Sequence, residues 1–209
     1  FILENVKGIT NHDNGNTLQT ILNTLNDLNY DVNYKILNAK DYNVPQNRER
    51  WYCIGFRRDL NIEIEKFCFP KAQPLNNKLE NLIEQSADSA YKISDTCYSN
   101  IKKYVKEKSI NVKNDTLAYE VTACRCQFKN DGISPCLTAK MGTGGNNVPI
   151  VIKQKRRLTE KECLRIMGYP ETYKINKGAQ TYKQIGNSVV VPIITLLATE
   201  MVKFLKKED

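Results

Sequence analysis

The stretch that decides the fold is Pro45-Gln46-Asn47-Arg48-Glu49-Arg50-Trp51-Tyr52-Cys53-Ile54-Gly55-Phe56, residues 45–56. The Val44-Pro45 pair disfavours helix, and the apolar run that follows predicts a strand entered from a polar segment. Arg48 and Arg50 are spaced i, i+2, so a strand projects both to one side. Guanidinium groups suit phosphate and base-oxygen contacts. Alternatively, the two arginines are solvated charges before an edge strand, with Glu49 as their local partner.

The chain on either side of this stretch predicts an α/β arrangement over residues 1–57. Residues 1–6 indicate the end of a buried strand. A helix of about three turns is predicted next from the spacing of apolar residues, and then a strand from their alternation. The apolar positions are Leu18, Ile21, Leu22, Leu25 and Leu28 in the helix and Val32, Tyr34 and Ile36 in the strand. The segment resembles the tail of a sheet whose earlier strands lie elsewhere, so we expect the edge at residues 1–6 to need a partner.

A second, smaller module is predicted at about 76–157, after the change of composition marked by Pro70 and Pro74. It is rich in Lys, Asn and Ser, with short helices near 76–85 and 98–108. A glycine-rich loop over 140–149 then leads into a strand-like Pro149–Ile152 segment.

The last part of the chain predicts two helices. Thr159-Glu160-Lys161-Glu162 is a capping box ahead of the first, which ends at Gly168-Tyr169-Pro170. The second runs from about 190 to 205. It follows Gly186-Asn187-Ser188 and has Pro192 in its first turn.

Composition indicates a soluble globular protein. The chain has 209 residues, of which 41% are hydrophobic and 26% charged, and no apolar run approaches 18 residues, so no membrane span is expected. The net charge of +8 fits a polyanionic partner, although basic balances are common. The seven scattered cysteines indicate reduced thiols. The spacing of Cys124 and Cys126, together with a single histidine, argues against a metal site.

Four positions offer chemistry, and each has a simpler reading. Glu4 ends a strand at the edge where α/β sheets carry ligands, and its carboxyl suits the ring nitrogen and amine of a cytosine; it is otherwise a surface acid. The Gly142–Asn147 loop suits backbone approach to a groove, with Asn146 and Asn147 reading base edges, or a phosphate cradle, or a plain hairpin connection. Gly186-Asn187-Ser188 suits a cofactor carboxylate or simple N-capping. Cys136 reads as a packed or idle thiol.

Taken in order, these segments resemble the C-terminal portion of a bacterial DNA cytosine-5 methyltransferase. Glu4-Asn5-Val6 resembles the Glu-Asn-Val motif of that family, and residues 46–50 resemble its Gln-x-Arg-x-Arg motif. Residues 156–170 resemble the ninth motif and residues 184–192 the tenth. Four motifs in the right order along the whole chain make the resemblance specific.

The resemblance implies a partial Rossmann-like sheet that serves S-adenosylmethionine-dependent methyl transfer, plus a small, largely irregular target recognition domain. It implies that a cytosine is flipped out of double-stranded DNA, that a cysteine attacks C6 and that C5 receives the methyl group. By the same analogy Glu4 activates the ring, Arg50 holds the cytosine oxygen, and Arg48 secures the adjacent backbone and active-site loop. Asn187, Ser188 and Val189 line the cofactor pocket. The residues expected to contact DNA, besides Arg48, are Thr138, Lys140, Gly144, Gly145, Asn146 and Asn147.

The departures from the family pattern are equally specific. The early Phe-x-Gly-x-Gly cofactor loop and the Pro-Cys-Gln nucleophile loop, which would precede Glu4, are absent from the sequence. Cys136 stands where relatives usually have threonine or serine. We therefore expect this chain to be either a subunit of a split enzyme or a C-terminal fragment of a longer protein, and to need the N-terminal half of the enzyme. We expect it to act in a bacterial or phage cytoplasm, as part of a restriction–modification system. The alternatives are a catalytically silent DNA-specificity module, an RNA-directed member of the family, or a decayed gene product.

The domain boundaries expected from these motifs divide the chain into three parts. Residues 1–75 would form the C-terminal part of the catalytic domain. Residues 76–183 would form the target recognition domain and hinge, and residues 184–209 a helix that returns to the catalytic domain.

Overall fold

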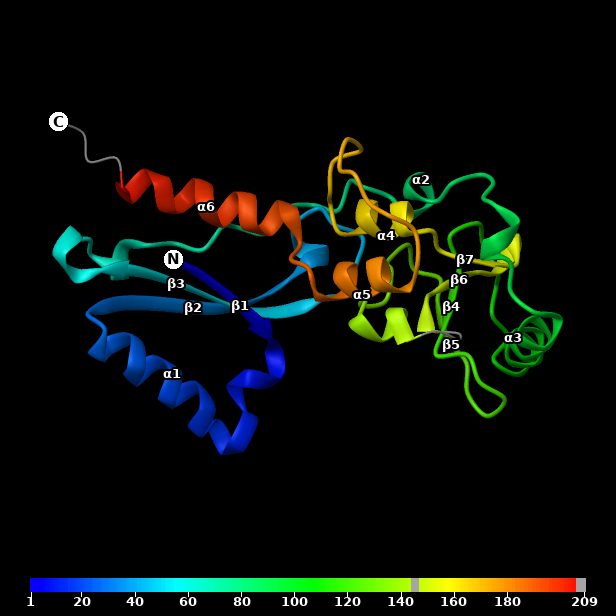
Figure 1. Cartoon of the computed structure of the whole chain (residues 1–209), viewed down its shortest axis with the longest axis horizontal. Helices are drawn as coiled ribbons and strands as arrows, with labels where there is room; N and C mark the ends of the chain where they lie inside the picture. The colour runs from blue at the N-terminus through cyan, green and yellow to red at the C-terminus, as the bar shows by residue number, and fades with distance from the viewer. Residues whose placement is uncertain (144–146, 206–209) are drawn as a thin grey trace.

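The computed structural model describes residues 1–143 and 147–205 (Figure 1). The strands are β1 (Ile2–Val6), β2 (Tyr30–Asn38), β3 (Glu49–Arg57), β4 (Leu117–Tyr119), β5 (Gln127–Lys129), β6 (Ile150–Val151) and β7 (Arg156–Arg157). The helices are α1 (Asn16–Asp27), α2 (Leu79–Leu82), α3 (Asp95–Glu107), α4 (Glu160–Ile166), α5 (Ala179–Asn187) and α6 (Val191–Leu205), with short 3-10 turns between them.

The first sheet has the order β1-β3-β2, and β3 is antiparallel to both neighbours. β1 and β2 therefore run parallel to each other and are joined by α1. The order strand, helix, strand, strand agrees with the prediction for this part of the chain. α1 covers one face of this sheet and α6 the other (Figure 1). The register places Glu4 opposite Tyr52 and Val6 opposite Arg50, so β1 and the start of β3 carry charged groups side by side.

Alternation along β3 divides its side chains between the two faces of the sheet. Trp51 and Cys53 belong to the cluster that α1 covers, whereas Tyr52 and Ile54 belong to the main core beneath α6. The helices contribute apolar residues at helical spacing to these two clusters: Leu18, Ile21 and Leu25 from α1, and Ile193, Leu197 and Met201 from α6. The sequence of β3 is apolar almost throughout, as expected for a strand with both faces buried.

The second sheet has the order β5-β4-β6-β7 and strands of only two or three residues. α3 packs Cys97 and Ile101 against Ala118 and Ile150 to form its small core. Most of the surrounding chain is irregular, in agreement with the expected module. α3 begins at Asp95, a few residues before the predicted start, because the Ser94 side chain accepts the Cys97 N–H as its N-cap. The helix predicted at 76–85 is confined to α2.

The capping box ahead of α4 is confirmed: Thr159 accepts the Glu162 N–H, and the Glu162 carboxylate accepts the Thr159 N–H. The same carboxylate forms a buried bidentate ion pair with Arg156, at 2.7 and 2.8 Å. This buried ion pair connects β7, in the small sheet, to the start of α4.

The last helix expected from about 190 to 205 is confirmed as α6, but the expectation that Asn187 or Ser188 caps its start is wrong. Gly186 and Asn187 form the last turn of α5, which the sequence analysis did not predict, and Ser188 is its C-cap. The last helix starts at Val191, because Pro192 has no N–H and is accommodated only in a first turn. α5 escaped prediction because its sequence is mostly polar and only one face of this nine-residue helix is buried.

The helical stretch Ala179–Leu205 is long and apolar enough to span a membrane by length and composition alone. It consists of α5 and α6 with a break at Ser188–Val190. The buried side of α6 packs into the protein core through Ile193, Leu197 and Met201. The apolarity of this stretch therefore has a structural role within the fold.

We expect Leu197→Ala to destabilise the protein by about 2–5 kcal/mol, because Leu197 is fully buried between α6 and the sheet and truncation leaves a cavity. Val202→Ala on the same helix is the matched control, since Val202 is 43% exposed. Denaturant unfolding of both variants measures the difference, and equal free energies of unfolding would contradict this packing of α6.

Candidate functional site

The first two predicted catalytic residues meet at the junction of β1 and β3. Arg50 Nε lies 3.1 Å from Glu4 Oε1, with the two side chains 14% and 20% exposed. The Arg50 Nη1 atom donates to the Glu49 carbonyl at 2.8 Å, which orients the guanidinium. The contact with Glu4 is electrostatic, and Glu4 Oε1 has no hydrogen-bond partner among the described residues. A buried carboxylate oxygen with spare accepting capacity suits a ligand that carries an N–H.

Arg48 is the third predicted catalytic residue, and its guanidinium acts as a buried clamp. Nη1 donates to the Leu137 carbonyl at 2.7 Å, while Nη2 donates to the carbonyls of Gly186 and Ser188 at 3.2 and 2.8 Å. Burial and the neighbouring charge of Arg50 lower the pKa of Arg48. One side chain thus joins the entry to β3, the segment between β5 and β6, and the turn between α5 and α6.

Cys136 lies between the two arginines. Its Sγ is 3.7 Å from Arg48 Nη1 and 3.8 Å from Arg50 Nη2. The reading of this thiol as packed or idle thus leaves out a contact with both members of the arginine pair. The i, i+2 spacing already placed those arginines on one side of the chain. What the sequence lacked was any sign that a residue 86 positions later in the chain would reach them.

Two further residues belong to the site: Gln46, the first residue of the Gln-x-Arg-x-Arg motif, to which no role was assigned, and Tyr52, which no motif includes. Gln46 is fully buried and accepts the Leu137 N–H at 3.1 Å. Tyr52 is also fully buried, lies opposite Glu4 in the register, and has a hydroxyl without a partner among the described residues. Burial and the charge of Glu4 raise its pKa, so the phenol stays neutral. Alternation from Arg50 to Tyr52 was the signal that could have identified it.

The predicted DNA-contacting residues follow directly after Cys136. Thr138 and Lys140 are exposed, and Lys140 lies in the 3-10 turn η7 (Ala139–Thr143) rather than in an open loop. η7 packs closely on α5, because a Cβ at Gly186 would come within 2.1–2.3 Å of the Thr138–Ala139 backbone. Asn147 is exposed and donates to Thr143 Oγ1 at 3.1 Å. Gly144, Gly145 and Asn146 lie outside the described residues.

The predicted cofactor residues lie in the turn from α5 to α6. Asn187 is exposed, and Ser188 and Val189 are partly exposed. The Ser188 hydroxyl donates to the Ile185 carbonyl at 2.7 Å, and the Ser188 carbonyl accepts from Arg48. The structure thus links this turn directly to the arginine pair, so the predicted catalytic and cofactor residues converge on one region.

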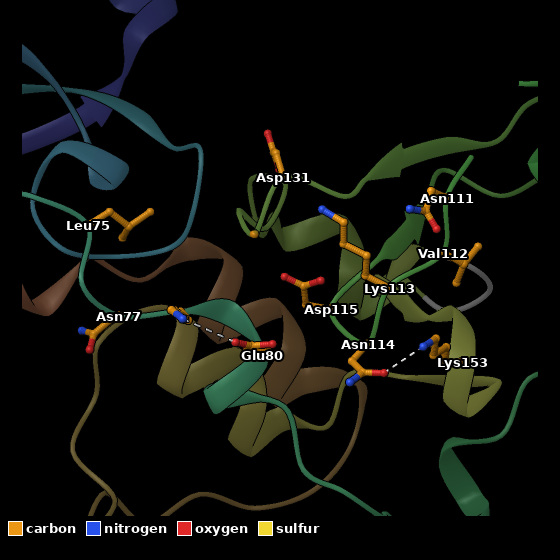
Figure 2. A pocket seen from close by; sticks show the side chains of 12 residues that line it. Leu75, Asn77, Glu80, Asn111, Val112, Lys113, Asn114, Asp115, Asp131 and Lys153 are labelled. Carbon is orange, nitrogen blue, oxygen red and sulfur yellow. Dashed lines mark hydrogen bonds and ion pairs between the residues drawn. The ribbon is translucent and has the colours of Figure 1, made fainter. Parts of the chain in front are cut away.

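A sizeable cavity lies elsewhere, between the 75–80 segment and the small sheet (Figure 2). It measures about 640 Å³ and has a mixed lining that includes Lys113, Asp115 and Asp131. Lys153 donates to Asn114 at its rim, at 3.0 Å. Its charges are of both signs and none of its lining residues belongs to the Glu4–Arg50 region, so size does not identify the functional site here.

We expect Arg48→Lys to lower the free energy of unfolding by about 1.5–3 kcal/mol, because a single ammonium cannot reach the three carbonyls that the planar guanidinium reaches. Arg57→Lys is the matched control, since Arg57 is exposed and forms an exposed ion pair with Asp59. Thermal and denaturant unfolding measure both variants. Equal stability of Arg48→Lys and the unmodified chain would contradict the clamp.

Known proteins match this chain over nearly its whole length. The family model for C-5 cytosine-specific DNA methylase matches residues 1–203. The type II methyltransferase M.Bsp6I of Bacillus sp. (strain RFL6) is 42% identical over 97% of this chain. M.HhaI of Haemophilus parahaemolyticus is 37% identical over 94% of it. The chain spans 65% and 61% of the lengths of these two relatives.

Solved structures show the same fold. The Entamoeba histolytica methyltransferase EhMeth superposes with a TM-score of 0.71 at 18% identity, over 99% of this chain and 63% of that one. A putative DNA modification methyltransferase from an E. coli prophage gives a TM-score of 0.68 at 18% identity, over 99% and 70% of the two chains. The fold is therefore that of the α/β methyltransferases. Given the family match over residues 1–203 and the 42% identity to M.Bsp6I, this chain belongs to the C-5 cytosine-specific DNA methylase family.

Proposed function

We propose that this chain is the base-activating and DNA-recognition part of a sequence-specific DNA cytosine-5 methyltransferase. The observation that carries the proposal is the convergence of Glu4, Arg50 and Arg48 at the end of the first sheet, beside the segment that begins at Cys136. The type II methyltransferases among the relatives support a role in a bacterial or phage restriction–modification system.

Glu4 and Arg50 are proposed to hold the flipped cytosine. A carboxyl group can face the ring nitrogen and exocyclic amine together, and the spare accepting capacity of Glu4 Oε1 supports that role. A guanidinium beside it provides N–H donors for the cytosine oxygen. Extrusion of the base costs a few kcal/mol, which contacts of this kind would offset. The partial burial of the pair strengthens each contact, because fewer water molecules compete.

Duplex binding is supported by where the charge lies. Residues 89–157, which contain the second sheet, hold 13 basic and 5 acidic residues, whereas residues 1–88 hold 10 basic and 12 acidic residues. The net charge of the whole protein therefore resides in the proposed recognition part. Phosphate contacts from such a surface give affinity that falls steeply with salt, and the exposed Thr138, Lys140 and Asn147 are proposed to lie nearest the bases.

S-adenosylmethionine fits one side of the α5–α6 turn. Asn187 offers an exposed amide, Ser188 a hydroxyl and backbone groups, and Val189 a partly exposed apolar surface. These groups match the polar and apolar parts of the cofactor, which supplies the methyl group. Arg48 would keep the turn in place through its bond to the Ser188 carbonyl, so that the cofactor side and the base side of the site stay in register.

A second polypeptide portion is proposed to complete the enzyme by supplying the nucleophile loop and the glycine-rich cofactor loop. β1 has a neighbour on one side only, in the described sheet, and Leu3 and Val6 on it are 39% and 53% exposed. On α6, Val202 and Leu205 are 43% and 53% exposed. An open strand edge with apolar side chains, beside a half-covered apolar helix, favours extension of the sheet by another strand.

We expect transfer of labelled methyl groups from S-adenosylmethionine to duplex DNA only when this chain is mixed with an N-terminal portion that carries the two missing loops, for example that of M.Bsp6I. The chain alone serves as the first control and the N-terminal portion alone as the second. A mixture that assembles, as judged by light scattering, yet transfers no methyl groups would favour the catalytically silent binding module.

In that assembled enzyme, we expect Glu4→Gln to slow methyl transfer by about 10²-fold or more, because the amide cannot deliver a proton to the ring. Duplex affinity should stay within about threefold, since the carboxyl makes no phosphate contact. Glu49→Gln is the matched control, because Glu49 is exposed and pairs with Lys7. Single-turnover rates and gel shifts separate the two effects, and an unchanged rate for Glu4→Gln would remove its proposed role.

A further inference from the structure

Gln46 makes an unusual set of contacts for a side chain two residues before the arginine pair. It is fully buried. Its Oε1 accepts the Leu137 N–H at 3.1 Å, and its Nε2 donates to the Ile166 carbonyl at 3.3 Å with Met167 Sδ at 3.1 Å. One amide therefore uses its acceptor on the segment between β5 and β6 and its donor on the end of α4.

Leu137 is held from both of its peptide groups. Gln46 accepts its N–H, and Arg48 donates to its carbonyl at 2.7 Å. The residue before it is Cys136, whose Sγ contacts both Arg48 and Arg50. Backbone bonds extend the junction, because the Asn47 N–H donates to the Ser134 carbonyl at 2.9 Å. The position of Cys136 against the arginines thus depends on the hydrogen bond between Gln46 and the Leu137 N–H.

We propose that Gln46 is a positioning residue that seats the 136–137 segment of the recognition part against the arginine pair, and so links DNA recognition to the catalytic arginines. The inference rests on the proposed function for its catalytic consequence. The positioning itself concerns this chain alone. The side-chain hydrogen bonds of Gln46 go to Leu137, Ile166 and Met167, so its influence on the arginine pair passes through Leu137 and Cys136.

The chemistry of the amide provides a sharp test. A protonated carboxylic acid has one O–H donor and one carbonyl acceptor, so Gln46→Glu can reproduce both bonds only while it is protonated. Burial raises the pKa of a carboxyl group. Below that raised pKa the variant should keep the segment seated, and as the pH rises through it the bond to the Ile166 carbonyl is lost. Gln46→Met fills a similar volume and lacks both bonds at every pH.

Cys136 reports the position of the segment without any enzymatic activity. Iodoacetamide alkylates a thiolate by displacing iodide, and mass spectrometry measures the rate at each cysteine. Cys124 is exposed and serves as the internal standard, whereas Cys53, Cys97, Cys126 and Cys163 are buried. The measured quantity is the rate at Cys136 divided by the rate at Cys124, with each variant compared to the unmodified chain at the same pH. Gln19→Glu is the matched control, since Gln19 is exposed on α1.

We expect this ratio to rise about fivefold or more in Gln46→Met, because local opening exposes Cys136. In Gln46→Glu it should rise at pH 8 and stay within about twofold of the unmodified chain at pH 6, following carboxyl protonation. Gln19→Glu should show neither change. A folded Gln46→Met with an unchanged ratio would overturn the proposal. If Gln46→Met does not fold, Gln46→Glu provides the test. The proposal would be overturned if the alkylation ratio of Gln46→Glu, relative to the unmodified chain, were the same at pH 6 and pH 8.

In the assembled enzyme we expect Gln46→Met to lower the single-turnover rate by about 10²-fold, the cost of a small misplacement of catalytic groups, with duplex affinity within about threefold. Wild-type rates in both variants would overturn the catalytic link. An assembled enzyme that is inactive without any substitution would count against the proposed function. The alkylation ratio would then still show whether Gln46 positions Cys136.

Discussion

The arrangement of this protein depends on the buried guanidinium of Arg48. It donates to three backbone carbonyls contributed by two segments far away in the sequence. A planar cation with five donors can satisfy several carbonyls at once, and once buried it must do so, because an unpaired buried charge is costly. The segment between β5 and β6 and the α5–α6 turn are therefore held at fixed positions relative to β3. Glu4 and Arg50, at the adjacent strand ends, acquire a defined environment as a result.

Charge and apolar surface are divided unevenly over the molecule. The excess positive charge lies in residues 89–157, around strands too short to form a large core. The first sheet is nearly neutral by comparison, is covered by α1 and α6, and leaves an open edge at β1. The side chains of Gln46 and Arg48 connect these two parts of the chain. Under the proposed function, the charged part would bind DNA and the first sheet would hold the catalytic residues.

Much of the fold was predictable because its signals are local. Alternation predicted β2, an apolar run predicted β3, helical spacing predicted α1, and the capping box predicted α4. α5 was missed because its sequence is mostly polar. That error placed Asn187 and Ser188 at the start of a helix, whereas they lie at the end of one. Cys136 was the other gap, since a thiol reveals its partners only when the chain brings them within reach.

The strand and helix types, the family motifs and the candidate residues Glu4, Arg48 and Arg50 were predictable from the sequence alone. The reason is that periodicity and motif spacing depend only on residues that are close together in the sequence. Which groups these residues contact could be seen only in the tertiary structure. The contacts of Arg48 with Leu137 and Ser188, and of Gln46 with Ile166, span 89–140 positions. Such contacts form because folding buries polar groups that must then find partners, and local sequence carries no record of which distant partner each will meet.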